Sequence, residues 1–269
     1  MTVDRGKTLE HVLAVAREAG EGIARIYAGK FDVEYKGPND PVTRADREAN
    51  TFICAELARA YPGMPIVAEE SDPASYAGFG KSPQAWFVDP LDGTREFVAR
   101  NGEFAVMIGL AENGRAVLGV LVCPALKRSF IGAEGMGAFE VNEAGDRKAI
   151  HVSGHEELKG ARVLVSRSHL PDAARARMNE LGLVTVPCGS AGVKAAKIAC
   201  GEGDLYAQPG RAGKLWDACA PEAVVCAAGG VWRTTAGFGY DYANESLENG
   251  RGIVAGNPKL IEAIVAVKW

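Results

Sequence analysis

The chain has 269 residues, of which 47% are hydrophobic and 24% are charged, and its formal net charge is −4. This length suits one large domain or two fused lobes, and the composition excludes collagen-like and low-complexity chains. The negative charge argues against a surface that coats nucleic acid, and every apolar stretch is too short to span a bilayer. The first residues lack the layout of a signal sequence, so we expect a cytoplasmic protein, with peripheral association with the inner membrane left open.

The first half of the chain begins with helical periodicity and continues as strands. Apolar residues recur at three- and four-residue steps over residues 9–27 and again over about 44–61, which predicts two amphipathic helices. Short strands are predicted over residues 65–68 and 85–88. Over residues 104–141, apolar runs separated by turns predict an antiparallel meander.

The second half alternates strands with helices. Strands are predicted over residues 163–166, 184–187, 204–207, 231–234 and 253–255, and helices over 171–181, 191–200, 218–228 and from Asn257-Pro258 onward. We therefore expect a layered α/β (α+β) sandwich of alternating helices and sheets. An N-terminal lobe over residues 1–150 would carry most of the acidic motifs described below, and a C-terminal lobe over residues 151–269 would carry Asp217 and the substrate pocket.

The cysteine pattern is that of a protein without disulfides. The six cysteines are Cys54, Cys123, Cys188, Cys200, Cys219 and Cys226. None forms a C-x-x-C pair and most lie within apolar runs, which predicts buried, reduced thiols. The four histidines form no H-E-x-x-H motif, so no zinc site is predicted.

The sharpest motif follows the predicted strand over residues 85–88 and reads Asp89-Pro90-Leu91-Asp92-Gly93-Thr94. Pro90 is expected to stop the strand, and Gly93 to allow a tight turn. Two carboxylates on one turn repel each other unless a cation lies between them, so a divalent metal is the natural partner. The N–H groups of Gly93 and Thr94 would suit a phosphate oxygen. Taken alone, the motif is equally consistent with an acidic turn that caps a helix.

Three further acidic segments lie at the ends of predicted elements. Asp46 lies at the entry to the second helix, Glu69-Glu70-Ser71 follows a short strand, and Trp216-Asp217 precedes a later helix, where Asp217 can act as N-cap. Each alone is explained by helix capping or by a solvated loop. Together they place four or five carboxylates at element ends, which are the oxygen ligands that Mg²⁺ takes beside water and phosphate.

In order and spacing these motifs resemble the inositol monophosphatase superfamily of Mg²⁺-dependent, lithium-sensitive phosphatases, over residues 7–267. The motifs are Asp40-x-Val42-Thr43-x-x-Asp46, Glu69-Glu70-Ser71, Asp89-Pro90-Leu91-Asp92-Gly93-Thr94 and Trp216-Asp217. Within the superfamily the chain is most similar to the 3′(2′),5′-bisphosphate nucleotidases. That likeness rests on four segments, which are Arg95-Glu96-Phe97-Val98-x-x-Asn101-Gly102-Glu103-Phe104, Ser166-Arg167-Ser168-His169, Gly189-Ser190-Ala191-Gly192-Val193-Lys194 and Trp216-Asp217-Ala218-Cys219-Ala220-Pro221-Glu222.

The resemblance implies a role for each matched residue. The metal ligands would be Glu69, Asp89, the Leu91 carbonyl, Asp92 and Asp217, holding two Mg²⁺ ions, with a third, weaker site near Glu69. Thr94 and Asp46, together with Glu69, would orient and deprotonate the attacking water, and no covalent phosphoenzyme is required. The phosphate and substrate contacts would be Gly93, Thr94, His169, Ser190, Lys194 and Arg211.

The implied reaction is hydrolysis of the 3′-phosphate of 3′-phosphoadenosine 5′-phosphate to AMP and phosphate, in connection with sulfate assimilation. Lys194 and Arg211 suit a second phosphate, although Lys194 on a solvated helix face and His169 in a polar turn remain open. One alternative is an inositol, sugar or histidinol phosphate phosphatase. Another is a metal- and nucleotide-binding regulator, which the intact set of matched acids disfavours. We expect a monomer or homodimer acting on a small phosphate ester, without nucleic acid.

Overall fold

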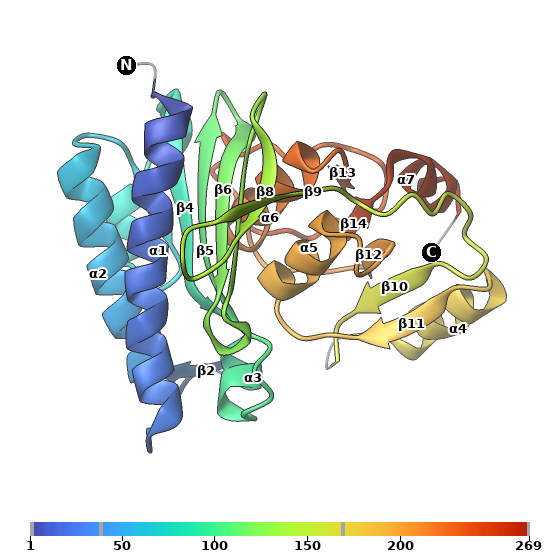
Figure 1. Ribbon diagram of the computed structural model, residues 1–269, viewed down its shortest axis with the longest axis horizontal. Helices are drawn as coiled ribbons and strands as arrows, with labels where there is room; N and C mark the ends of the chain where they lie inside the picture. Colours follow the sequence, from blue (N-terminus) through green and yellow to red (C-terminus); the bar gives the residue numbers. More distant parts are fainter. Residues whose placement is uncertain (1–2, 38–39, 168–169, 268–269) are drawn as a thin grey trace.

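The computed structural model describes residues 3–37, 40–167 and 170–267. Figure 1 shows helices and sheets stacked in alternating layers, as the sequence predicts. Helices α1 (Arg5–Ala28) and α2 (Arg44–Ala60) form the outer layer on one face of a long sheet. None of the helices in the described part of the chain is both long and apolar enough to cross a membrane.

The long sheet contains seven strands among the described residues, in the order β3-β4-β5-β6-β7-β8-β9. The strands are β3 (Ile66–Ala68), β4 (Gln84–Asp92), β5 (Ala105–Glu112), β6 (Arg115–Cys123), β7 (Arg128–Ala133), β8 (Gly137–Val141) and β9 (Arg147–Ile150). Pairing is antiparallel from β4 to β9, which confirms the predicted meander, whereas β3 and β4 are parallel.

A second sheet has the order β11-β10-β12-β14-β13. Its strands are β10 (Arg162–Val165), β11 (Val184–Pro187), β12 (Leu205–Gln208), β13 (Val231–Arg233) and β14 (Ile253–Gly256). Helices α5 (Ala191–Ala199) and α6 (Trp216–Ala227) lie between the two sheets, and α4 (Asp172–Glu180) and α7 (Pro258–Val265) lie on the outer face of the second. The remaining elements are the hairpin of β1 (Val33–Gly37) and β2 (Asp40–Thr43), helix α3 (Thr94–Val98) and 3₁₀ turns at Pro73–Tyr76, Phe79–Lys81 and Pro124–Leu126. The division into lobes at about residue 150 stays a prediction.

The core lies on both faces of the seven-stranded sheet. On β4, Trp86 and Val88 pack in the cluster formed with α1 and α2, whereas Ala85 and Phe87 pack in the cluster formed with α5 and α6. Because helices cover both faces, the strands read as near-continuous apolar runs rather than as alternating ones. The end of β4 is therefore held rigidly between two layers.

Helix α6 lies directly on the backbone of the sheet along a row of three glycines. Gly109, Gly119 and Gly132 are register neighbours on β5, β6 and β7. A Cβ added at Gly109 would lie 2.6 Å from the Ala220 nitrogen, one at Gly119 would lie 2.3 Å from the Ala220 oxygen, and one at Gly132 would lie 2.9 Å from Val224 Cα. A side chain on any of them would push the helix away, so this row fixes the height of α6 above the sheet.

We expect Gly119→Ala to destabilise the fold by about 1–3 kcal/mol, because the added methyl group overpacks a helix–sheet contact that has no room for it. Chemical denaturation measures the free energy of unfolding, and Gly154→Ala is the control variant. A Cβ at Gly154 meets nothing within 4 Å. A loss within 0.5 kcal/mol of the control would contradict this account of the packing.

The cysteines are free, as predicted, but their burial differs along the chain. Cys123, Cys188 and Cys219 are buried, Cys54 and Cys200 are half-buried, and Cys226 is exposed. The expectation of a buried thiol is therefore wrong for Cys226. It lies in the last turn of α6 and lines a surface cavity.

Candidate active site

A pocket of about 780 Å³ lies at the end of β4, against the starts of α5 and α6. Its acidic lining residues are Asp40, Glu69, Asp89, Asp92, Glu96 and Asp217, and its basic ones are Lys36, Arg95, Lys194, Arg211 and Lys214. All the residues that the sequence assigns to the site line it except two. Asp46 lies behind Thr94, and His169 lies outside the described residues.

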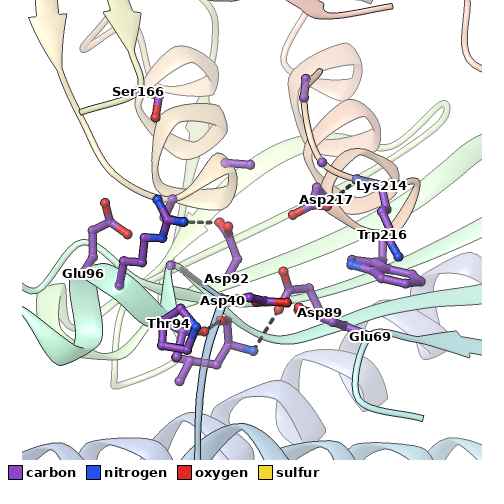
Figure 2. A pocket seen from close by; sticks show the side chains of 18 of the residues that line it. Asp40, Glu69, Asp89, Asp92, Thr94, Glu96, Ser166, Lys214, Trp216 and Asp217 are labelled. Carbon is purple, nitrogen blue, oxygen red and sulfur yellow. Dashed lines mark hydrogen bonds between the residues drawn. The ribbon is translucent and has the colours of Figure 1, made fainter. Parts of the chain in front are cut away.

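Three carboxylates form the centre of this pocket, two on buried residues (Asp89 and Asp92) and one on the half-buried Asp217. One oxygen from each of Asp89, Asp92 and Asp217 lies within 4.8 Å of the others. Figure 2 shows the three side chains together, with Glu96 to one side and Lys214 to the other. Burial raises the pKa of all three carboxyl groups, and repulsion between the neighbouring carboxylates raises the pKa values of Asp89 and Asp217 further.

This donor set fits a divalent cation. Carboxylate oxygens are the ligands that Mg²⁺ and Ca²⁺ take in proteins, and three such groups held this close together are unfavourable without a compensating charge. Lys194 acts electrostatically on Asp92, and Lys214 on Asp217. The strongest electrostatic influences on Asp89 come from Glu69, Asp92 and Asp217, and all three raise its pKa. The acidic triad could therefore bind metal.

Strand β4 continues through Pro90 to Asp92, so the expectation that Pro90 ends the strand is wrong. The register with β5 shifts between Asp89 and Asp92, where two residues of β4 stand opposite one. Pro90 is tolerated because β3 has already ended at Ala68, and no strand among the described residues pairs with Pro90 on that side and needs its missing N–H group. In a regular strand, residues three apart point to opposite faces, and the bulge brings both carboxylates into one pocket.

Asp217 is the second residue of α6, not its N-cap as the sequence predicts. Leu215 holds the cap position without a side-chain bond, and the Asp217 carboxylate accepts a hydrogen bond of 2.6 Å from the Lys214 N–H group. The loop folds back over the helix start at Gly213, which has φ +75° and where a Cβ would lie 2.4 Å from Asp217 Oδ2. The preceding loop, rather than the first helical turn, therefore orients this carboxylate.

Asp46 and Thr94 form a hydrogen-bonded pair beside the triad. Thr94 Oγ1 donates to Asp46 Oδ1 at 2.9 Å, and the Leu91 carbonyl lies 3.2 Å from the same hydroxyl. The other Asp46 oxygen accepts from the N–H and hydroxyl groups of Thr43, in a capping box at the start of α2. Burial raises the pKa of the Asp46 carboxyl group. Asp46 therefore helps to cap helix α2 and is also linked to the pocket through the Thr94 hydroxyl.

Glu69, at the end of β3, also lines the pocket and is bound to a lysine that sequence reasoning missed. Lys36 Nζ on β1 lies 3.0 Å from Glu69 Oε1 and 2.6 Å from Glu70 Oε1. Burial raises the pKa of the Glu69 carboxyl group, and Lys36 opposes that shift. No spacing in the sequence connects Lys36 with Glu69, because only the folding of the β1–β2 hairpin over the pocket brings them together.

Asp92 is held by the first turn of α5. Its Oδ2 accepts hydrogen bonds from the Ser190 hydroxyl and, at 2.7 Å, from the Gly192 N–H group. Gly93 follows with φ +93°, and a Cβ there would lie 2.8 Å from the Glu103 oxygen. Glycine is thus required at the turn that joins β4 to α3.

Lys194 lies within the protein and not on a solvated helix face. The residue is 4% exposed. Its Nζ donates to the Ser190 carbonyl oxygen at 2.8 Å and lies 5.0 Å from the centre of the Tyr206 ring. Burial lowers the pKa of its ammonium group. Arg211, in contrast, is an exposed residue at the pocket, paired with Glu248 at 2.8 Å. The two cations that the sequence groups together therefore occupy a buried and an exposed part of one pocket.

A family model and three related proteins show which family this chain belongs to. The model of the inositol monophosphatase family matches residues 4–269. The 3′(2′),5′-bisphosphate nucleotidase CysQ of Salmonella typhimurium is 38% identical over 244 residues, which are 90% of this chain and 96% of the relative. The solved structure of CysQ from Bacteroides thetaiotaomicron is 28% identical, with a TM-score of 0.77 over 93% of this chain and 97% of its own. The extragenic suppressor protein suhB from Bartonella henselae is 28% identical, with a TM-score of 0.82 over 97% of each chain.

The matched range contains the acidic triad, the Asp46–Thr94 pair and the first turn of α5. The layered fold that the motifs imply is confirmed by the solved structures. The resemblance that the motifs carry is confirmed as well, since the family model and the relatives agree over most of the chain. This chain belongs to the inositol monophosphatase family.

Proposed function

We propose that the protein is a Mg²⁺-dependent phosphomonoesterase that converts 3′-phosphoadenosine 5′-phosphate to AMP and phosphate. The observation that carries this proposal is the acidic triad of Asp89, Asp92 and Asp217 beside a hydrogen-bonded Asp46–Thr94 pair. The nucleotide substrate is supported by relatives named 3′(2′),5′-bisphosphate nucleotidase at up to 38% identity. We place the enzyme in the cytoplasm, where free thiols persist, as a monomer or homodimer.

In this proposal Glu69, Asp89, the Leu91 carbonyl, Asp92 and Asp217 hold two Mg²⁺ ions, with a third site near Glu69. When bound, Mg²⁺ polarises the phosphate oxygens and makes the attacking water more acidic. The Thr94 hydroxyl donates a hydrogen bond to Asp46 Oδ1, which leaves the lone pairs of its oxygen free to accept a hydrogen bond from water in the pocket. Asp46 then receives a proton through Thr94 as the water attacks phosphorus. The N–H groups of Gly93 and Thr94 bind the phosphate.

We propose that Lys194 and Arg211 bind the second phosphate, and that Ser190 and His169 contact the nucleotide. Both basic residues line the pocket that contains the triad. A phosphate recruits such cations through charge-assisted hydrogen bonds. An inositol or histidinol monophosphate has no second phosphate, so these two residues would discriminate between the substrates.

Lys194→Met is expected to raise KM for the bisphosphate nucleotide by about tenfold or more, because it removes a charge-assisted contact and keeps the side-chain length. The KM for inositol 1-phosphate is expected to change much less. Steady-state phosphate release measures both constants, with Lys197→Met as the matched control on the same helix. Equal effects on both substrates would mean that Lys194 supports the turn at Ser190 without reading the second phosphate.

The function is tested by phosphate release from 3′-phosphoadenosine 5′-phosphate, inositol 1-phosphate, histidinol phosphate and fructose 1,6-bisphosphate. Each assay is run with Mg²⁺, with chelator, and with Mg²⁺ plus Li⁺. We expect kcat/KM for the nucleotide to exceed the others by about a hundredfold, or about 2.7 kcal/mol, and to be lost with chelator. Preference for another phosphate ester would overturn the nucleotide assignment, and absence of turnover on all four would overturn the enzymatic one.

A further inference from the structure

Glu103 and Arg167 form an ion pair that lies outside the pocket, next to the turn before α5. We propose that Glu103, fixed by Arg167, is a positioning residue that keeps the Ser190 turn against Asp92. Neither residue lines the pocket. The inference rests on the proposed function only in so far as Asp92 binds a metal that the reaction uses.

The contacts of Glu103 join three segments that are far apart in the sequence. Its Oε2 accepts from the Gly189 N–H group at 2.7 Å and from Arg167 Nε at 2.8 Å, and its Oε1 accepts from Arg167 Nη2 at 2.9 Å. Burial raises the pKa of the Glu103 carboxyl group, but the bonds from Arg167 and Gly189 outweigh burial and hold it below its usual value. Glu103 is therefore a charged acceptor that binds the backbone of Gly189.

Gly189 leads directly into the turn that grips Asp92. Ser190 has φ +57°, a left-handed conformation that is unfavourable for a residue with a side chain. In that conformation its hydroxyl donates to Asp92, accepts from the Val193 N–H group at 3.0 Å, and its backbone leads to the Gly192 N–H group that also binds Asp92. A strained turn persists only where the surrounding structure holds it. The hydrogen bond from the Gly189 N–H group to Glu103 lies one residue before the strained Ser190.

Steric fit restricts the same segment. A Cβ added at Gly189 would lie 2.2 Å from Glu96 Cγ, so this backbone lies against the Glu96 side chain of α3. The side chain of Glu103 is 14% exposed and that of Arg167 is 45% exposed. An ion pair with one partner this exposed adds little to global stability, whereas partners that orient a metal ligand affect affinity or activity by about 10- to 100-fold. We therefore expect the effect of Glu103 on the site to exceed its effect on the fold.

The test uses the full chain with Glu103→Ala and Glu103→Gln. We expect Glu103→Ala to weaken Mg²⁺ binding, measured by titration calorimetry, by about tenfold or more, and to lower kcat at saturating Mg²⁺ with little change in KM. Glu103→Gln keeps an oxygen acceptor for Gly189 and is expected to recover most of the affinity. Arg167→Met is expected to have a smaller effect in the same direction, since it leaves the Glu103–Gly189 bond in place.

Glu202→Ala is the matched control, because the Arg128–Glu202 pair at 2.7 Å also joins the seven-stranded sheet to the segment that follows α5, but neither residue lines the pocket. Equal losses of Mg²⁺ affinity in the control and in Glu103→Ala would overturn the proposal, as would unchanged affinity in Glu103→Ala. If the wild-type protein hydrolyses none of the phosphate esters but Glu103→Ala still weakens Mg²⁺ binding selectively, the proposed function fails and the positioning role stands.

Discussion

Asp89→Asn is expected to reduce Mg²⁺-dependent phosphate release by at least about a thousandfold, since the metal's stabilisation of transition-state charge amounts to several kcal/mol. Asp89 is 2% exposed and lies where the pKa-raising effects of Glu69, Asp92 and Asp217 converge. An amide there keeps one oxygen that can accept from the Leu91 N–H group but removes the charge. The measurement is kcat/KM at saturating Mg²⁺, together with Mg²⁺ binding by calorimetry.

The same substitution is expected to leave the metal-free fold intact or to stabilise it, because one of several mutually repelling buried carboxylates is neutralised. Chemical denaturation in chelator measures this, with the exposed Asp32→Asn as the control. Loss of activity together with gain of metal-free stability separates a ligand from a structural residue. Activity within tenfold of wild type would remove Asp89 from the metal site.

The acidic residues could be found in the sequence because they lie at the ends of apolar runs. Asp89 and Asp92 follow the apolar run over residues 85–88 within β4, and Asp217 stands just before the apolar run of α6. Such ends are local features, and the layers bring them to one pocket. The same reasoning could not place Pro90, because whether a proline ends a strand depends on the neighbouring strand, and here β3 has already stopped.

Contacts between segments distant in the sequence leave weaker signals. Lys194 is buried against Tyr206 of β12, and Lys36 reaches Glu69 only through the β1–β2 hairpin. The glycine row on β5, β6 and β7 did leave a signal, since Gly109 and Gly119 interrupt otherwise apolar strands. Glycine inside a strand marks a close backbone approach, but the sequence does not say that the approaching element is α6.

The hydroxyl of Thr94 gives the second large expected effect. Thr94→Val keeps the shape of the side chain and removes the hydroxyl group that links the pocket to Asp46 Oδ1. General acid–base assistance contributes about 10²- to 10⁴-fold in rate, so we expect kcat to fall within that range. The KM for substrate and the affinity for Mg²⁺ are expected to change little, because the side chain of Thr94 is not among the proposed metal ligands.

Thr94→Ser is the control that separates the hydroxyl from the methyl group. The serine hydroxyl can donate a hydrogen bond to Asp46 as the threonine hydroxyl does, so Thr94→Ser is expected to keep most of the wild-type kcat. If the methyl group mattered through packing instead, kcat would fall in Thr94→Ser but not in Thr94→Val. The burial that raises the pKa of Asp46 makes it a stronger proton acceptor than an exposed aspartate. Asp46 can therefore take up the proton that passes through the Thr94 hydroxyl. If Thr94→Val keeps kcat within threefold of wild type, the proton does not pass through Thr94, and Asp46 serves α2 as a cap alone.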